Sequence, residues 1–361
     1  MISIDRLRWF FVGTELKAQR ARRLVKIVIL LALFIGLFWI VPVESVVRAL
    51  WTASPLYLLI GFILAIFSWS LTALELEPLV RKQGIKRNFL QILQINLSVK
   101  FYLLFAPSTL VGSGVRWYRL SQPEGKVAES LAALAFFRLL ENFLTISIGL
   151  GFWLLSGGKG LQVSLEWIAI LILGIILMWF LATRVSLPMY RWLKPHTTRL
   201  WDRPFWREIL RRFEKLLVAV SVYADIPILD LLIAIAGGIS SLLAGVMSAQ
   251  YLARSVGVQL SFLQMGWISS IVLLATQLPF TVAGGLGVRE VTLVAILPTL
   301  GVSAELALAF SFLLFIRGVV IALIGGLIEV QRAFRAPRIV PSPVELTPPE
   351  VETIGGGMEE S

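Results

Sequence analysis

Long apolar runs separated by short polar segments recur along this chain, and they constrain its fold more than any other feature. The runs at 128–155, 228–251 and 303–329 are each long enough to cross a bilayer as a helix, which takes about 20 residues. The strands of a membrane β-barrel are shorter, about 10 residues, and alternate apolar with polar positions. The composition agrees, since 57% of the residues are hydrophobic and 15% are charged, against about 25% charged in soluble domains. We therefore predict an all-α polytopic membrane protein.

The order of apolar and polar segments predicts one transmembrane domain at 27–330, with about seven or eight spans. A basic segment at 1–26 precedes it. A tail at 331–361 follows, basic at first and then rich in Pro and Glu, and we expect it to be disordered because it cannot bury a core. The basic stretch 183–226 is expected to form an amphipathic helix at the membrane interface; a small solvated helix packed on the bundle is the alternative. The expected spans are 27–41, 54–74, 89–106, 128–155, 162–182, 228–251, 261–283 and 303–329.

Two of the apolar segments are interrupted by proline and glycine. The first, 107–116, reads PSTLVGSGVR, and the second, 279–290, reads PFTVAGGLGVRE. In the hydrocarbon core, irregular backbone is tolerated only where it is buried in protein or lines a wet cavity. Gly112 and Gly285 lie 173 residues apart, as do Arg116 and Arg289. Paired interruptions in two halves of a chain indicate the binding site of a transporter; ordinary loops between helices are the alternative.

The glycines of these segments are expected to adopt positive φ, or to lie where a Cβ would collide with substrate or with the other half. They are Gly112, Gly114, Gly284, Gly285 and Gly287. A glycine-rich turn followed by arginine offers backbone N–H groups and a cation to an anion such as a phosphate headgroup. Neither segment is a Walker A loop, because no Gly-Lys-Ser/Thr follows, and neither has the strand–helix context of a dinucleotide fingerprint.

The positive-inside rule gives a topology. The strongly basic segments 1–26, 75–88, 183–226 and 331–338 are all expected on the cytoplasmic side. All four segments can lie on that side only if 89–120 and 261–302 each return to the side of the membrane from which they entered. The two broken segments then enter the membrane from opposite sides, as in the inverted repeats of many carriers. Both termini are expected in the cytoplasm, with the chain in the cytoplasmic (inner) membrane.

Charged residues inside the predicted spans mark candidate functional positions. Arg138 and Glu141 lie one helical turn apart in the fourth span, and Arg317 lies near the middle of the last. A charge at the centre of a membrane helix costs at least about 2.5–3.5 kcal/mol, so it is expected to face a cavity or a partner. A purely structural Arg138–Glu141 pair is the alternative. For Arg116, Arg289 and Glu290 the alternative is snorkelling to the interface.

These motifs resemble the flippase-like membrane family that includes the transmembrane region of lysylphosphatidylglycerol synthases. The resemblance covers roughly residues 25–330. The first family pattern falls on Asn96, Pro107, Ser108, Gly112 and Arg116, although Val111 replaces a glycine and Ser113 replaces an acidic residue. The second falls on Pro279, Gly284, Gly285, Leu286, Gly287 and Glu290, and Arg138 and Arg317 are also similar to family positions. The resemblance implies movement of a phospholipid or a polyprenyl-linked lipid between leaflets.

The predicted function is therefore that of a lipid flippase rather than an enzyme; nothing after residue 340 is expected to fold into an aminoacyl-transferase domain. The headgroup is predicted to contact Asn96, Gly112, Gly114, Arg116, Arg138, Glu141, Gly284, Gly285, Gly287, Arg289, Glu290 and Arg317. The alternatives are a carrier for a small anionic solute, coupled to protons through Glu141 or Glu290, a membrane enzyme, and a non-transporting partner of a lipid-modifying enzyme or glycosyltransferase.

Composition limits the ligands that we expect. The net charge of +11 would suggest nucleic acid for a soluble protein, but the basic residues here flank apolar runs. They indicate contact with anionic lipid headgroups, so membrane lipids are the expected partners and nucleic acid is not. The chain has no cysteine and one histidine, His196, which leaves no thiolate or all-histidine metal site. No metal and no other cofactor is expected.

Overall fold

A computed structural model describes residues 44, 48, 50–105, 109–122, 124–157, 173, 188, 218–277 and 285–335. Within these ranges the regular elements are helices, and no strand is present. Four helices are long and apolar enough to cross a membrane: α3 (Pro55–Lys82), α6 (Val127–Leu155), α10 (Ile228–Ser255) and α13 (Ala304–Arg335). The shorter helices are α4 (Phe89–Phe105), α5 (Thr109–Ser121), α11 (Phe262–Thr276) and α12 (Val288–Ile296), with 3₁₀ turns η3 (Val222–Asp225) and η4 (Leu297–Leu300).

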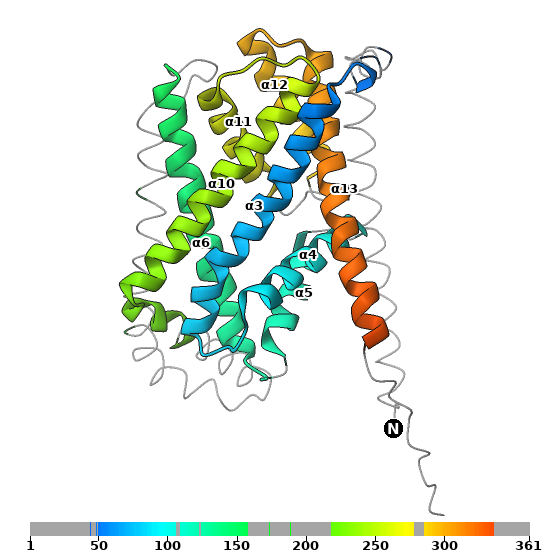
Figure 1. The fold of residues 1–361 in the computed structure, drawn as a ribbon. Helices are drawn as coiled ribbons and strands as arrows, with labels where there is room; N and C mark the ends of the chain where they lie inside the picture. Colours follow the sequence, from blue (N-terminus) through cyan, green and yellow to red (C-terminus); the bar gives the residue numbers. More distant parts are fainter. Residues whose placement is uncertain are drawn as a thin grey trace, which may run out of the picture.

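Helices α3 and α10 pack against each other in the centre of the molecule and run antiparallel (Figure 1). At one end, the backbone N–H of Ser54 donates to the carbonyl of Ser255 at 2.9 Å. At the other end, Arg81 forms an ion pair with Asp230 at 2.6 Å. The two helices are therefore in contact along their whole lengths.

Small residues allow this close approach. Near one end of the pair, the Ser248 hydroxyl donates to the carbonyl of Gly61 at 2.7 Å. Towards the other end, a Cβ on Gly237 would lie only 2.8 Å from the backbone nitrogen of Glu75. Without a hydrophobic drive between helices in lipid, such small-residue contacts and interhelical hydrogen bonds are what hold membrane helices together.

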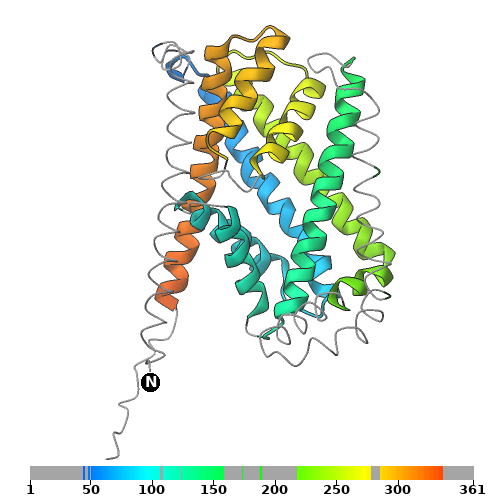
Figure 2. The ribbon, with the colours of Figure 1, turned by 180° about the vertical axis from the view of Figure 1, so that it is seen from behind.

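Each broken pair of helices packs against the long helix from the other half of the chain. Helix α4, which is followed by α5, packs on α13, and α11, which is followed by α12, packs on α6 (Figure 2). The shorter members instead contact the long helix of their own half, because α5 contacts α6 and α12 contacts α13. The first and second halves are thus interlocked across the α3–α10 pair.

Two hydrophobic clusters lie at opposite ends of the α3–α10 pair. One contains Trp267 and Phe310, each 1% exposed, and is built from α10, α11, α12 and the first half of α13. The other contains Phe136, whose ring stacks on that of Tyr223 at 4.2 Å, and is built from α3, α4 and α6. The outward face of α3 is also apolar, with exposed Leu56, Leu59, Ile63 and Phe67 at the spacing of one helical face. Such a stripe suits contact with lipid chains.

The structure corrects several predicted boundaries. Helix α3 continues to Lys82 rather than ending at 74, and it passes through Pro78; the first carboxylates after the apolar run do not end the helix, because Glu75 is buried against α10. Helix α13 continues to Arg335, past the predicted boundary at 330. Helices α4, α6 and α10 agree closely with the predicted spans.

Some predicted segments lie outside the described residues. They are 1–26 and 27–41, nearly all of 162–182, most of 183–226, and 336–361. The predicted count of seven or eight spans therefore stays a prediction, next to the four spanning-length helices found in the described ranges.

Candidate functional site

A cavity of about 260 Å³ lies between the two hydrophobic clusters. It is lined from α3, α4, α6, α10, α11, α12 and α13, so both halves of the chain form its walls. Its wall is largely apolar but includes the hydroxyl groups of Ser68, Thr72, Thr145, Ser241, Ser269 and Thr276. The broken segments were expected to lead to a cavity of this kind, enclosed by helices from both halves.

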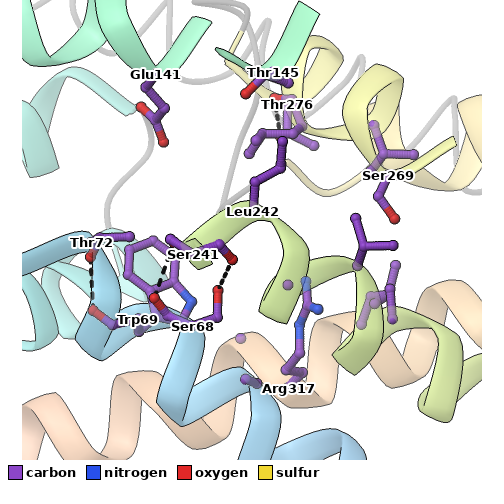
Figure 3. A pocket seen from close by; sticks show the side chains of 18 of the residues that line it. Ser68, Trp69, Thr72, Glu141, Thr145, Ser241, Leu242, Ser269, Thr276 and Arg317 are labelled. Carbon is purple, nitrogen blue, oxygen red and sulfur yellow. Dashed lines mark hydrogen bonds between the residues drawn. The ribbon is translucent and has the colours of Figure 1, made fainter. Parts of the chain in front are cut away.

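The contact between Ser68 and Ser241 forms part of the wall (Figure 3). The Ser68 hydroxyl donates to the carbonyl of Ser241 at 2.8 Å, and the Ser241 hydroxyl donates to the carbonyl of Ser68 at 3.1 Å. The contact is reciprocal, and the two residues are 173 positions apart. That separation equals the one between Gly112 and Gly285 in the broken segments.

Five charged side chains line the cavity, and they come from five different helices. Glu141 of α6 and Arg317 of α13 point toward the space between them (Figure 3). Glu75 of α3, Lys100 of α4 and Arg289 of α12 complete the set. The sequence predicted three of these five residues: Glu141, Arg289 and Arg317.

Two of the lining cations have no carboxylate partner among the described residues. Arg317 donates to the Ser248 hydroxyl at 3.3 Å, and its Coulombic neighbour is another cation, Arg289. The ammonium of Lys100 lies 3.8 Å from the centre of the Trp69 ring, a cation–π contact. Both groups can therefore accept an anionic ligand without first giving up an ion pair.

Arg289, by contrast, is held in a closed network at the start of α12. Its guanidinium contacts the Glu290 carboxylate at 2.5 Å and donates to the Ser311 hydroxyl at 3.1 Å. The other oxygen of Glu290 accepts from the backbone N–H of Gly287 at 2.6 Å and caps the helix. Arg289 and Glu290 are 7% and 4% exposed. Glu290 is thus a structural partner of Arg289, and it does not line the cavity itself.

Arg116, which occupies the matching place in the first broken segment, has different surroundings. It is buried, its guanidinium lies 5.7 Å from the centre of the Phe137 ring, and its Nε finds no acceptor among the described residues. The next residue is Trp117, where the second segment has Glu290. Arg116 lies near the cavity rather than in its lining, within Coulombic range of Glu75 and Lys100.

Arg138 and Asn96 lie behind the lining residues. Arg138 forms the predicted pair with Glu141 at 2.7 Å, with 46% and 21% of the two side chains exposed. Asn96 is fully buried, and its amide donates to the hydroxyl of Thr72 at 3.4 Å. Both residues therefore reach the cavity through a neighbour that lines it.

The glycines of the two segments differ in conformation. Gly285 and Gly287 have φ of +101° and +86°, as predicted, and a Cβ on Gly285 would collide with Thr276. Gly112 and Gly114 lie inside helix α5 without positive φ. A Cβ on Gly112 would meet the Leu103 side chain at 2.5 Å, whereas Gly114 faces open space. The fifth predicted glycine, Gly284, lies outside the described residues.

Two charged lining residues escaped the prediction. Glu75 fell in the basic segment 75–88, which was expected on the cytoplasmic side, and Lys100 fell in the predicted span 89–106 without being named as a candidate. The signal for Glu75 was the continuing helical pattern through Leu76, Leu79 and Val80, all of which are fully buried. The Ser68–Ser241 contact could have been found by applying the 173-residue offset outside the glycine motifs.

Comparison with known proteins identifies a matching family. The family model described as "Lysylphosphatidylglycerol synthase TM region" matches residues 23–326. No curated protein matches the chain. The matched range contains all of the cavity-lining residues.

Proposed function

The chain belongs to the family of the lysylphosphatidylglycerol synthase TM region, and we propose that it moves a lipid with an anionic headgroup between the leaflets of the cytoplasmic membrane. It is a multi-pass membrane protein, and its cavity lies midway along the spanning helices. The observation that carries the proposal is Arg317, a cation in that cavity that has no carboxylate partner among the described residues. A cation at membrane depth is costly to keep, and an anionic headgroup would offset its charge.

The charge balance around the cavity supports an anionic ligand. Five basic side chains lie in or next to it: Lys100, Arg116, Arg138, Arg289 and Arg317. They face three carboxylates: Glu75, Glu141 and Glu290. Glu141 forms an ion pair with Arg138, and Glu290 forms one with Arg289. A phosphate group fits the remaining excess of positive charge, because guanidinium groups bind it through paired hydrogen bonds.

We further propose that the two halves form an inverted repeat. The reciprocal hydrogen bonds join residues 173 positions apart, at the offset of the broken segments. Helices α3 and α10 run antiparallel, and the packing of α4 on α13 mirrors that of α11 on α6. A two-fold axis that relates antiparallel spanning helices lies in the membrane plane. Such repeats in carriers place substrate near the midplane, between the halves.

The proposed mechanism follows from that arrangement. The headgroup enters the cavity from one leaflet while its acyl chains stay in the bilayer, and it leaves to the other leaflet as the halves rock about the α3–α10 contact. We propose both termini on the cytoplasmic side, because the basic segments 1–26 and 331–338 favour that side. Transport, and no catalytic step, is the proposed role; chemical modification of the lipid is left to a partner enzyme.

Reconstitution tests this proposal. Vesicles containing the protein and fluorescent phosphatidylglycerol should show transfer of the label between leaflets, measured by dithionite quenching, and Arg317→Gln should abolish it. Arg254→Gln is the matched control, because Arg254 is exposed at the end of α10. No transfer above that of protein-free vesicles would contradict the proposal. Uptake of glycerol phosphate in its place would assign the same cavity to a small anionic solute.

A further inference from the structure

Glu75 occupies an enclosed position that the proposed headgroup site does not use. It lies on α3, lines the cavity and is only 2% exposed. Gly237 and Gly238 of α10 make room for it: a Cβ on Gly238 would lie 3.1 Å from both the carboxyl carbon and Oε1 of Glu75. The same Cβ would lie 2.6 Å from the Leu144 side chain. The carboxyl group thus fills a slot between α3, α6 and α10.

The charged groups around Glu75 come from α4, α5, α6 and α13. Helix α6 contributes Glu141 and Arg138, and α5 contributes Arg116, all within Coulombic range. Lys100 of α4 and Arg317 of α13 line the same cavity. From α10 the slot is formed by glycine rather than by a charged residue.

None of these groups pairs with Glu75. Among the described residues, no donor reaches its buried Oε1, and no ion pair involves it. An ionised carboxylate in an apolar slot, without hydrogen bonds, carries a large desolvation cost and takes up a proton in preference.

Unlike Glu75, the other two carboxylates at the site each have an ion-pair partner. Glu141 is paired with Arg138 at 2.7 Å and is partly exposed. Glu290 is held by Arg289, Ser311 and the backbone of Gly287. Glu75 is therefore the carboxyl group at this site that is arranged to gain and lose a proton.

We propose that the Glu75 carboxyl group binds the proton that is carried together with the lipid headgroup; this inference rests on the proposed function. The step is a simple protonation: the carboxylate takes one proton from the side on which the headgroup enters and releases it on the other side. With Glu75 neutral, the cavity has one more unmatched positive charge and binds the anionic headgroup more strongly. One proton thus accompanies one anionic charge.

The first test detects the proton without transport. Infrared spectra of the protein in phosphatidylcholine vesicles should contain the C=O band of a protonated carboxyl group at neutral pH. The band should be lost in Glu75→Gln and kept in Glu141→Gln and Glu77→Gln. Glu77 is the matched control, since it lies two positions away on α3 outside the cavity lining. Absence of the band in the wild-type protein, or its persistence in Glu75→Gln, would overturn the assignment.

The second test measures coupling. In vesicles that contain labelled phosphatidylglycerol, a pH gradient that is acidic on the side of the label should accelerate its translocation by the wild-type protein and by Glu77→Gln. Glu75→Gln should lose this acceleration. If the pH gradient does not change the translocation rate of the wild-type protein, the coupling role is wrong, although the protein still transports lipid. If the infrared band titrates on Glu75 but no lipid moves, the failure belongs to the proposed function and not to the proton site.

Discussion

The two broken helix pairs, α4–α5 and α11–α12, carry similar motifs and use them differently. In the second pair, Gly285 and Gly287 turn the backbone at positive φ, and Arg289 is bound by Glu290 and Ser311. In the first pair the glycines are helical, and Arg116 lies over the ring of Phe137 with its Nε unbound. A single residue explains much of this difference, because Trp117 stands where the second motif has Glu290. In the second segment the arginine is therefore held by protein side chains, whereas in the first segment the arginine has no carboxylate next to it in the sequence.

The largest expected effect is on the second segment. Glu290→Ala leaves Arg289 buried without its carboxylate and removes the cap of α12. We expect the free energy of unfolding to fall by about 3–5 kcal/mol, the typical cost of breaking a buried pair. Thermal unfolding in detergent measures it, with Glu129→Ala at the start of α6 as the control. A stable Glu290→Ala variant would show that the Arg289 network does not anchor α12.

The glycines give the next largest contrast. Gly285→Val places a β-branched side chain at φ +101° against Thr276, and we expect a loss of about 2–4 kcal/mol of stability from backbone strain and overpacking. Gly114→Val faces open space on a helix and should cost less than about 1 kcal/mol. The same unfolding assay compares them. Equal losses at both positions would remove the conformational difference between the two segments.

Lysine replacements separate charge from geometry at the two arginines. Arg289→Lys keeps one charge but loses the fork that binds both Glu290 and Ser311, so stability should fall by about 1–3 kcal/mol. Arg116→Lys should leave stability within about 1 kcal/mol of wild type yet slow lipid translocation. Unfolding and dithionite quenching on the same samples test both expectations. Wild-type translocation by Arg116→Lys would mean that Arg116 does not hold a phosphate through its paired donors.

The smallest effect concerns the contact between the halves. Ser68→Ala and Ser241→Ala each remove one donor from the reciprocal pair, and each should cost about 0.6 kcal/mol, the average for hydrogen bonds between membrane helices. The proposed repeat predicts nearly equal losses for the two substitutions. A loss confined to one of them would contradict the equivalence of α3 and α10 at this point.

The sequence predicted the all-helical membrane class, the limits of α4, α6 and α10, and the family, and these predictions are confirmed. It could not place Glu75 in a membrane helix, because a carboxylate after an apolar run is also what ends a span. The slot made by Gly237 and Gly238 accommodates the Glu75 carboxyl group within the helix. That slot depends on contacts between residues far apart in the chain.

The limits of motif matching appear in the glycines and arginines. The sequence suggests equal roles for Gly112 and Gly285, yet their conformations differ because one lies inside a helix and the other begins a turn. It likewise grouped Arg289 and Glu290 as two headgroup ligands. Adjacent residues of opposite charge instead bind each other once both are buried. The role of each predicted ligand in headgroup binding stays a prediction.

The central claim, a headgroup site between two halves that opens to either side, can be tested by cysteine labelling, since the chain has no cysteine of its own. Ser269→Cys places a thiol in the cavity lining (Figure 3). Glu124→Cys and Ser303→Cys mark the exposed turns at its two ends. A membrane-impermeant maleimide should reach position 269 from both sides, and phosphatidylglycerol should slow this labelling while phosphatidylcholine does not. Each turn should label from one side alone. Labelling of position 269 from a single side, or with equal rates in both lipids, would contradict the account.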